Sequence, residues 1–132
     1  MKNNGLASEE AFEKLIEKRY GKKQFIYKIV DTKSAGKIVK SGPADWVITI
    51  EGTMSWAEVK SCSHDTSFPF KNFTDAQMRG MVRQHAAGGT YKIFIHRVPT
   101  DEWFEITPYQ ILSRIEEGRK SITWKELQQY KF

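Results

Sequence analysis

Two apolar stretches joined by Glu51-Gly52 constrain the fold of this chain more than any other feature. Residues 44–50 and 53–61 are rich in the β-branched and aromatic side chains that favour strands. Glu51-Gly52 between them is a candidate two-residue turn. Such a turn pairs Ile50 with Thr53 and thereby sets the partner of every other residue in the two strands. The sequence therefore predicts an antiparallel β-hairpin in a single register.

In that register Asp45 lies opposite Glu58 on the same face of the sheet, with Cβ atoms roughly 5 Å apart. Lys60 follows Glu58 by two residues, so strand alternation places it on the same face. Two facing carboxylates repel each other, and a divalent cation such as Mg²⁺ or Mn²⁺ relieves that repulsion. The carbonyl of Val59 is a further candidate ligand. A metal held there can activate water for attack on a phosphodiester, with Lys60 orienting or deprotonating that water or neutralising the developing charge.

The same triplet also occurs as a solvated surface cluster of two acids and one lysine. Against that alternative, both strands are apolar, and charges are rarely placed on buried strands without a partner. Glu9 on a predicted first helix is a candidate additional ligand. Glu10 and Glu13 compete for that position, and acidic residues near a helix N-terminus also have a purely electrostatic role.

The remaining pattern predicts a mixed α/β (α+β) domain over residues 1–132, with a central mixed sheet flanked by helices. Further strands are expected over residues 24–30, 91–98 and 102–106, and residues 31–42 form a polar loop or projecting hairpin. Helices are expected over residues 8–20, with Ser8 as N-cap, and over residues 74–87, 108–118 and 124–130. Residues 63–73 are turn-like in composition.

Composition limits the function classes. The chain has 132 residues, a length typical of one domain, and a net charge of +5, which favours a polyanionic partner. A single cysteine excludes an intrachain disulfide, and no apolar run reaches membrane-spanning length. We expect a soluble cytoplasmic protein. The three histidines, His64, His85 and His96, are too widely spaced for a compact metal motif.

Basic residues outside the hairpin are candidate phosphate contacts. Lys33, Lys37 and Lys40 lie in the polar segment and either follow a DNA backbone or form a solvated loop. Arg79 and Arg83 are four residues apart on a predicted helix, so they share a face. They either contact DNA or keep that face soluble.

Several motifs together resemble a known family. Asp45 followed by Glu58-Val59-Lys60 resembles the PD-(D/E)XK nuclease signature. The segment Thr66-Ser67-Phe68-Pro69-Phe70-Lys71-Asn72-Phe73 with Gln77, and the segment Gly118-Arg119-Lys120-Ser121-Ile122, are similar to RecU-type Holliday-junction resolvases, as is Gly5 followed by Glu9-Glu10. The likeness extends over nearly the whole chain.

The resemblance implies a restriction-endonuclease-like core and a homodimeric, Mg²⁺-dependent endonuclease of DNA recombination and repair. Such an enzyme nicks two opposing strands of a four-way junction, in a bacterial cell or a phage-infected host. It implies that Asp45 and Glu58 bind metal, that Lys60 assists catalysis and that Gln77 is an auxiliary residue beside the site. It also implies DNA contacts at Lys71, Arg119 and Lys120.

Two departures from the family pattern stand out. Pro43-Ala44 replaces the hydroxyl residues that precede the family's aspartate, so any role of that hydroxyl is lost or moved. The stretch around residues 34–38 is shorter than the family's projecting stalk. Two other functions therefore remain open: a related nuclease acting on duplex or flap DNA, or a basic DNA-binding domain without catalysis. The complete set of Asp45, Glu58 and Lys60 disfavours the non-catalytic domain.

Overall fold

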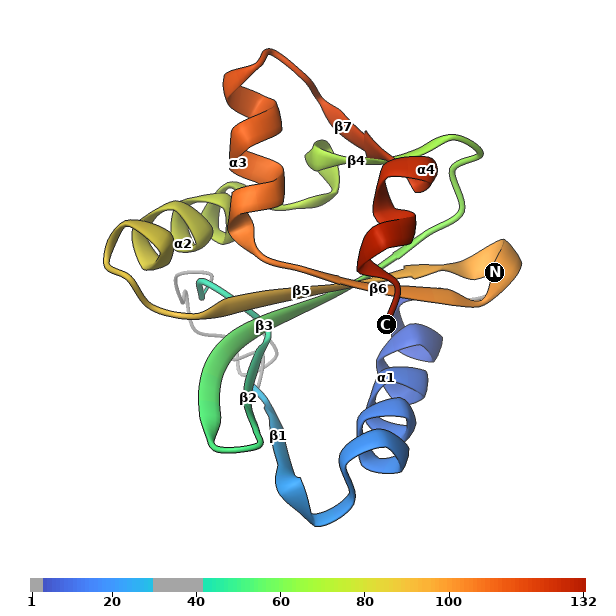
Figure 1. Ribbon diagram of the computed structural model, residues 1–132, viewed down its shortest axis with the longest axis vertical. Coiled ribbons are helices and arrows are strands. Elements are labelled where there is room, and N and C mark those ends of the chain that lie inside the picture. The colour runs from blue at the N-terminus through green and yellow to red at the C-terminus, as the bar shows by residue number, and fades with distance from the viewer. Residues whose placement is uncertain (1–3, 30–41) are drawn as a thin grey trace, which may run out of the picture.

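A computed structural model of the chain describes residues 4–29 and 42–132 (Figure 1). The helices and strands are α1 (Asn4–Tyr20), β1 (Gln24–Lys28), β2 (Trp46–Ile50), β3 (Thr53–Cys62), β4 (Ser67–Pro69), α2 (Asp75–Ala86), β5 (Tyr91–Arg97), β6 (Glu102–Ile106), α3 (Pro108–Glu116), β7 (Ser121–Thr123) and α4 (Trp124–Leu127). Lys33, Lys37, Lys40 and the expected stalk lie outside the described residues. Within the described residues, no helix has the length and apolarity needed to cross a membrane.

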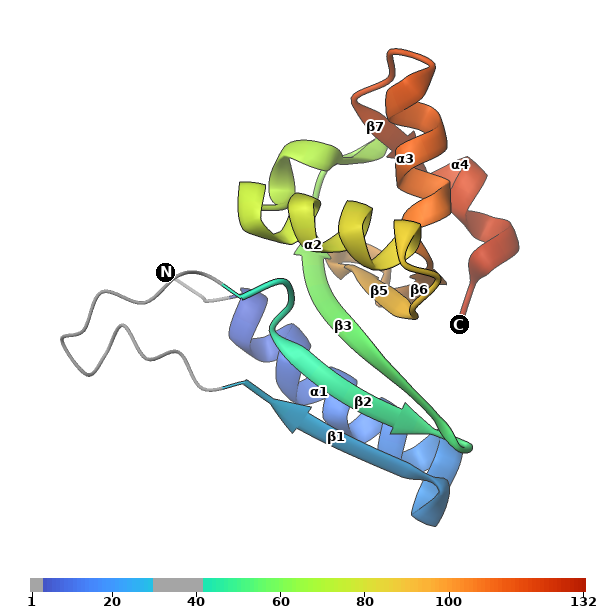
Figure 2. The same ribbon diagram turned by 90° about the vertical axis from the view of Figure 1, so that its left-hand side faces the viewer.

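The centre of the fold is a mixed five-stranded sheet with the strand order β1-β2-β3-β5-β6. Only the β3–β5 pair is parallel, and the other neighbours are antiparallel. Helix α1 lies on one face of this sheet, and α2 and α3 lie on the other (Figure 2). This arrangement confirms the expected α/β class with a mixed sheet between helices.

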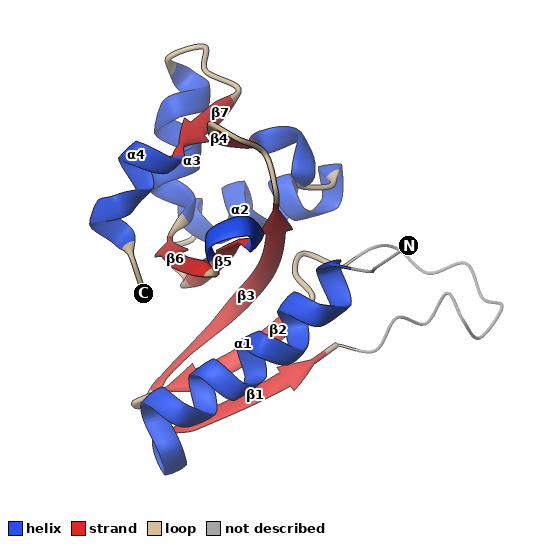
Figure 3. Ribbon diagram, turned by 90° about the vertical axis from the view of Figure 1, so that its right-hand side faces the viewer, coloured by secondary structure: helices blue, strands red, loops and turns tan. Residues whose placement is uncertain are grey.

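Strand alternation explains why the helices sort to two faces. In β2, Trp46, Ile48 and Ile50 are buried in the same apolar cluster as Phe12 and Ile16 of α1. Figure 3 shows α1 running along the β1–β2–β3 side of the sheet. The alternate residues of β2, Val47 and Thr49, are only partly buried.

A second apolar cluster fills the opposite face. It joins Ile93 and Ile95 of β5 to Met81 of α2 and Ile111 of α3, and all four side chains are fully buried. Because Asp45 and Glu58 alternate with the residues that face α1, the fold places these two acids on the α2 side of the sheet.

The β2–β3 hairpin has the predicted register, with Ile50 opposite Thr53 and Trp46 opposite Ala57. Both turn residues have positive φ, 50° at Glu51 and 88° at Gly52. This is the conformation of a type I′ turn, whose twist matches that of the flanking strands. The turn prediction is therefore confirmed.

Helix α1 begins earlier than predicted, at Asn4 rather than beside Ser8. Ser8 is not the N-cap: its side chain is buried, and its Oγ lies 2.7 Å from Nδ1 of His96. A serine in the body of a helix can bond across to a neighbouring strand as well as cap the helix. The prediction that Ser8 caps the helix is therefore wrong.

Residues 63–73 are more ordered than their turn-like composition suggested. They contain β4, which pairs antiparallel with β7 through Ser67↔Thr123 and Pro69↔Ser121, and a 3₁₀ turn over Phe70–Asn72. The two segments that carry the family resemblance therefore lie side by side. The other elements match their predicted ranges to within a few residues, and β6 matches without a shift.

Candidate active site

Asp45 immediately precedes the first residue of β2 and lies opposite Glu58 of β3. The backbone N–H of Asp45 donates to Oε1 of Glu58 over 2.6 Å. The side chain of Asp45 is exposed, whereas that of Glu58 has no exposed surface. One carboxylate is therefore open to solvent, and its neighbour is enclosed by protein.

The second oxygen of Glu58 meets two further groups. The amide Nε2 of Gln77 on α2 donates to Oε2 of Glu58 over 3.0 Å, and Nζ of Lys60 lies 3.8 Å from the same oxygen. Gln77 is itself buried and reciprocally caps α2, since its Oε1 accepts the N–H of Thr74 and its own N–H donates to Thr74 Oγ1. The cap that starts α2 therefore also orients the Glu58 carboxyl.

The pKa of Glu58 is raised from its usual value of 4.5 to about 8. Burial is the largest cause, and the negative charge of Asp45 adds to it, while Lys60 and the Asp45 N–H act in the opposite direction. A buried carboxyl beside a second acid is costly to ionise unless a cation compensates it. The pair therefore has the electrostatic character of a cation site.

The carbonyl of Val59 points toward the same region. The N–H of Trp56 donates to the carbonyl of Thr90, just before β5, over 3.3 Å, so the backbone groups of Trp56 point toward the β5 edge of β3. Backbone groups alternate between the two edges of a strand, so the carbonyl of Val59 points toward the β2 edge. Because β2 begins at Trp46, opposite Ala57, Val59 lies beyond the end of β2, where Asp45 stands.

This donor set suits a hard divalent cation. Carboxylate and carbonyl oxygens are the ligands of Mg²⁺ and Mn²⁺, and Mg²⁺ is usually held by one or two carboxylates together with waters and substrate phosphate. Within residues 4–29 and 42–132, no three His, Cys, Asp or Glu side chains gather as a metal cluster. The site accordingly fits an ion completed by substrate and not a closed structural site.

Glu9 lies near this site from the other side of the sheet. Its charge contributes to the raised pKa of Glu58, and its carboxylate is paired with Lys28 of β1. Glu9 is partly buried, whereas Glu10 and Glu13 are exposed. Among the three candidate acids of α1, Glu9 is thus the one that is partly buried and whose charge acts on Glu58, although it is paired with Lys28.

The segment that carries Asp45 is held by two residues that sequence reasoning missed. Tyr91 Oη donates to the carbonyl of Pro43 over 2.7 Å, and Gly80 of α2 packs directly against Pro43. Burial, together with the charges of Glu58 and Asp45, raises the pKa of Tyr91. Gly80 stands inside an otherwise regular helical pattern, and this was the one feature of the sequence that could have indicated its close contact with Pro43.

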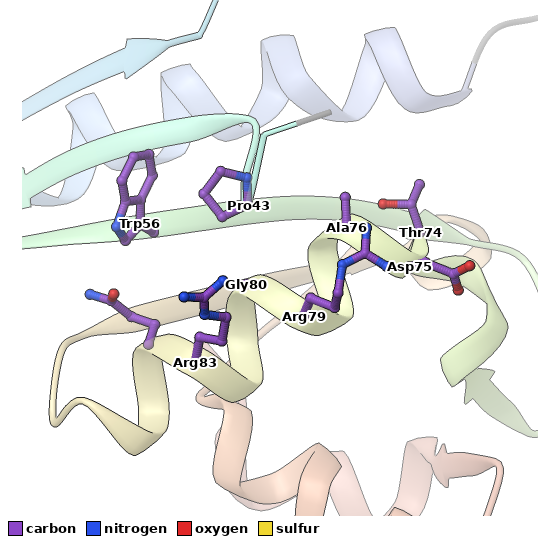
Figure 4. A pocket seen from close by; sticks show the side chains of 9 residues that line it. Pro43, Trp56, Thr74, Asp75, Ala76, Arg79, Gly80 and Arg83 are labelled. Atoms are coloured by element: carbon purple, nitrogen blue, oxygen red, sulfur yellow. The ribbon is translucent and has the colours of Figure 1, made fainter. Parts of the chain in front are cut away.

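Arg79 and Arg83 share a face of α2, as predicted, and both line a cleft of about 910 Å³ (Figure 4). Pro43 and Trp56 form the opposite wall. The cleft borders the segment that leads into Asp45.

The other predicted DNA contacts lie elsewhere. Lys71 and Lys120 are exposed and line a second hollow, of about 570 Å³, at the β4–β7 sheet. Arg119 lines it too, but its guanidinium donates to both oxygens of Glu126, over 2.5 and 2.8 Å. These bonds from Arg119 are the main reason that the pKa of Glu126 lies well below its usual range, and Glu126 also binds Arg114 and takes part in the capping box of α4. Arg119 thus has a structural role that the sequence did not reveal.

The chain is similar to known proteins in both sequence and fold. A family model described as "Recombination protein U" matches residues 10–132. The fold is similar to that of Hjc from Archaeoglobus fulgidus, a Holliday junction resolvase of an archaeal hyperthermophile, with 16% identity, a TM-score of 0.62 and coverage of 93% of this chain and 91% of that one. No curated protein gives a significant match. The predicted RecU-type resemblance and nuclease fold are confirmed, and the chain belongs to the Recombination protein U family.

Proposed function

We propose that residues 1–132 form a single nuclease domain that resolves four-way DNA junctions by hydrolysing one phosphodiester at each of two opposing strands. The observation that carries this proposal is the buried Glu58 carboxyl, held between Asp45, Gln77 and Lys60 with a pKa of about 8. Family membership and the resolvase fold support the same function.

The ion that we propose for this site is Mg²⁺, with Mn²⁺ as a substitute. Asp45, Glu58 and the Val59 carbonyl would hold it, and Glu9 would contribute from α1. Such an ion supplies a Lewis acid that activates water and neutralises charge on the phosphodiester. Family members of this kind depend on a metal, and the oxygen-only donor set supports a hard cation.

The protein side chains have separate roles in this proposal. Lys60 lies close enough to Glu58 to orient the attacking water or to stabilise charge on the phosphate, because its ammonium group is 3.8 Å from the carboxyl. Gln77 acts as a positioning residue, since its amide fixes the rotamer of Glu58. The basic residues, including Lys71, Lys120, Arg79 and Arg83, would guide the DNA backbone.

We also propose that the working unit is a homodimer. One such site cuts one strand, and resolution needs two coordinated cuts, which a two-fold dimer supplies with two equivalent sites. Light scattering on the protein with and without junction DNA tests this. A monomer under both conditions would contradict the paired-nick mechanism.

The function is tested with labelled four-way junction, linear duplex and flap DNA in Mg²⁺. We expect symmetric paired nicks in the junction, with linear duplex left intact. Asp45→Asn should abolish cleavage and retain junction binding, while Asp65→Asn, at an exposed loop residue, should leave both unchanged. Cleavage by Asp45→Asn would exclude the proposed site.

The same assay distinguishes the two alternative functions. Equal cutting of duplex or flap DNA would indicate a related nuclease with another substrate. Junction binding without cleavage in either Mg²⁺ or Mn²⁺ would indicate a non-catalytic DNA-binding domain. The second outcome is disfavoured because a binding domain has no need of a buried carboxyl paired with a second acid.

A further inference from the structure

The cleft beside the active site combines a flat apolar wall with a cationic one. Pro43 and Trp56 lie on the sheet side, Arg83 projects from α2 toward them, and Arg79 extends from the same helix face toward the end of the cleft at Asp75 (Figure 4). Among the described residues that line the cleft, Asp75 alone is acidic, and it lies at the end away from Trp56 (Figure 4). The end of the cleft at Trp56 is therefore both aromatic and basic.

Trp56 differs from the other tryptophans of the chain. Trp46, Trp103 and Trp124 are buried, with 1%, 7% and 3% of their surface exposed, whereas Trp56 is only partly buried. An exposed indole surface beside cations is available to stack on a flat ligand. It sits two residues before Glu58 on the same face of β3, so the two Cα atoms are about 6.6 Å apart along the strand.

Arg79 and Arg83 carry charge that the described part of the protein does not neutralise. Both side chains are exposed, and no carboxylate within the described ranges lies within ion-pair distance of either guanidinium. By contrast, Arg97, Arg114 and Arg119 are each paired with a glutamate. As far as the described residues are concerned, the two cleft arginines are therefore available to an anion from outside the chain.

We propose that this cleft binds one unstacked nucleotide of the DNA strand being cut, with its base against Trp56 and its flanking phosphates at Arg79 and Arg83. Aromatic stacking combined with cations along the backbone is the general mode of single-strand binding. The assignment of the strand as the one being cut rests on the proposed function. The binding of an unstacked nucleotide does not.

The internal bases of a duplex cannot stack on Trp56, because both faces of each base are already stacked on neighbouring bases. A base enters an aromatic pocket only after leaving the stack, and that costs least where pairing is already interrupted. The exchange point of a four-way junction is such a place. The cleft therefore favours DNA that is locally unpaired next to the phosphodiester to be cut.

Intrinsic fluorescence tests the proposal, because Trp56 is the one tryptophan that a ligand in the cleft can contact. The full chain is titrated in EDTA with a single-stranded oligothymidylate, with a blunt duplex of equal length and with an abasic oligonucleotide of equal charge. We expect saturable quenching by the oligothymidylate and at least ten-fold weaker binding of the other two. Equal quenching by the abasic chain or the duplex would overturn the proposal.

Three variants separate stacking from folding. Trp56→Phe should keep oligonucleotide affinity, measured by anisotropy of a labelled strand, and lose the quenching signal. Trp56→Leu should lose about ten-fold in affinity, and Arg83→Ala should lose a similar factor that shrinks as salt is raised. Phe25→Leu, at an exposed aromatic residue outside the cleft, should bind as the parent does. Thermal unfolding identifies any variant that fails to fold.

Unchanged affinity in Trp56→Leu, with the fold intact, would overturn the proposal. These measurements need no cleavage, so they test nucleotide binding in the cleft separately from the proposed nuclease function. Loss of oligonucleotide binding in Trp56→Leu, in a protein whose parent does not cut junctions, would leave the cleft assignment standing and reject the nuclease function alone.

Discussion

Gly80 of α2 leaves no room for a side chain beside Pro43. A Cβ atom at position 80 would lie 2.6 Å from Cβ of Pro43 and 2.8 Å from both its Cα and its carbonyl oxygen. Two of these three atoms belong to the backbone, which cannot rotate away as a flexible side chain can. Pro43 precedes Asp45 by two residues, so the approach of α2 to this segment sets the position of the exposed carboxylate.

Gly80→Ala should therefore reduce the catalytic rate, even though alanine favours the helical conformation more than glycine does. Alanine is favoured over glycine in a helix by about 1 kcal/mol, but here its methyl group displaces the Pro43 segment. We expect kcat on junction DNA to fall at least ten-fold with little change in KM. Val82→Ala, at an exposed residue of the same helix, is the control and should keep full activity.

A second substitution tests whether the collision is the cause. Pro43→Gly removes the nearest of the three atoms, so the double variant Pro43→Gly with Gly80→Ala should recover part of the lost kcat. Independent, additive effects of the two substitutions would contradict a direct contact.

The raised pKa of Glu58 predicts how stability depends on pH without metal. Its folded pKa of about 8 exceeds its ordinary value of 4.5, so between these pH values the folded state holds a proton that the unfolded state has released. This contribution is fully present below pH 4.5 and is lost as pH rises through 8. Urea unfolding in EDTA should show stability falling with pH, by at most about 1.4 kcal/mol per pH unit.

Glu58→Gln removes that titration, so its stability should fall less steeply between pH 5 and 8. Glu10→Gln, at an exposed residue of α1, should keep the parent slope. Added Mg²⁺ should stabilise the parent more at pH 8 than at pH 6, because the ion and the proton compete for the same carboxyl. Parallel curves for Glu58→Gln and the parent would show that Glu58 titrates normally.

Gln77 is predicted to have two roles that substitutions can separate. Gln77→Ala removes both the cap contact with Thr74 and the bond to Glu58, and should cost about 1 kcal/mol of stability as well as activity. Gln77→Glu preserves the capping box, in which glutamate is equally common, but places a third carboxylate beside Glu58. We expect near-parent stability at low pH, where the new carboxyl is protonated, a loss of stability as pH rises, and a strongly reduced cleavage rate.

Gln110 supplies a matched control, because it occupies the same position in the Thr107 capping box of α3 and touches no carboxylate of the site. Gln110→Glu should be neutral in both chemical denaturation and junction cleavage. Full activity of Gln77→Glu would show that the Gln77–Glu58 bond is dispensable.

A substitution in the β2–β3 turn is predicted to stabilise the protein without affecting the active site. Glu51 adopts φ 50°, which is unfavourable for glutamate, while Asn-Gly is the preferred type I′ sequence. Glu51→Asn should raise the unfolding free energy by roughly 0.5 kcal/mol and leave cleavage unchanged, because the full length of β2 separates it from Asp45. Gly52→Ala, at φ 88°, should destabilise. A loss of stability in Glu51→Asn would contradict the turn assignment.

The parts of the site that the sequence predicted are those that local rules determine. A two-residue turn and strand alternation place Asp45, Glu58 and Lys60 without reference to the rest of the chain, and the predicted register is the one observed. The placement of Gln77 near the site came from family resemblance, since no periodicity relates a helix residue to a strand residue, and its bond to Glu58 was not predicted.

What the sequence did not reveal depends on contacts between distant segments. The bonds of Tyr91 to Pro43 and of Ser8 to His96 each join residues from separate elements, and neither side chain lies in a recognisable motif. Strand β4 was missed because it has only three residues and includes Pro69, and its ladder exists only once β7 is beside it.

The pairing of β4 with β7 also has a consequence for synthesis. A ribosome delivers Asp45, Glu58, Lys60 and Gln77 well before it delivers Ser121–Thr123. The two acids can face each other as soon as their hairpin closes, whereas the stretch that links Lys60 to α2 pairs with a strand that is synthesised only after α3. The charged pair can therefore form before the β4–β7 sheet does, since the hairpin is complete in the nascent chain well before β7.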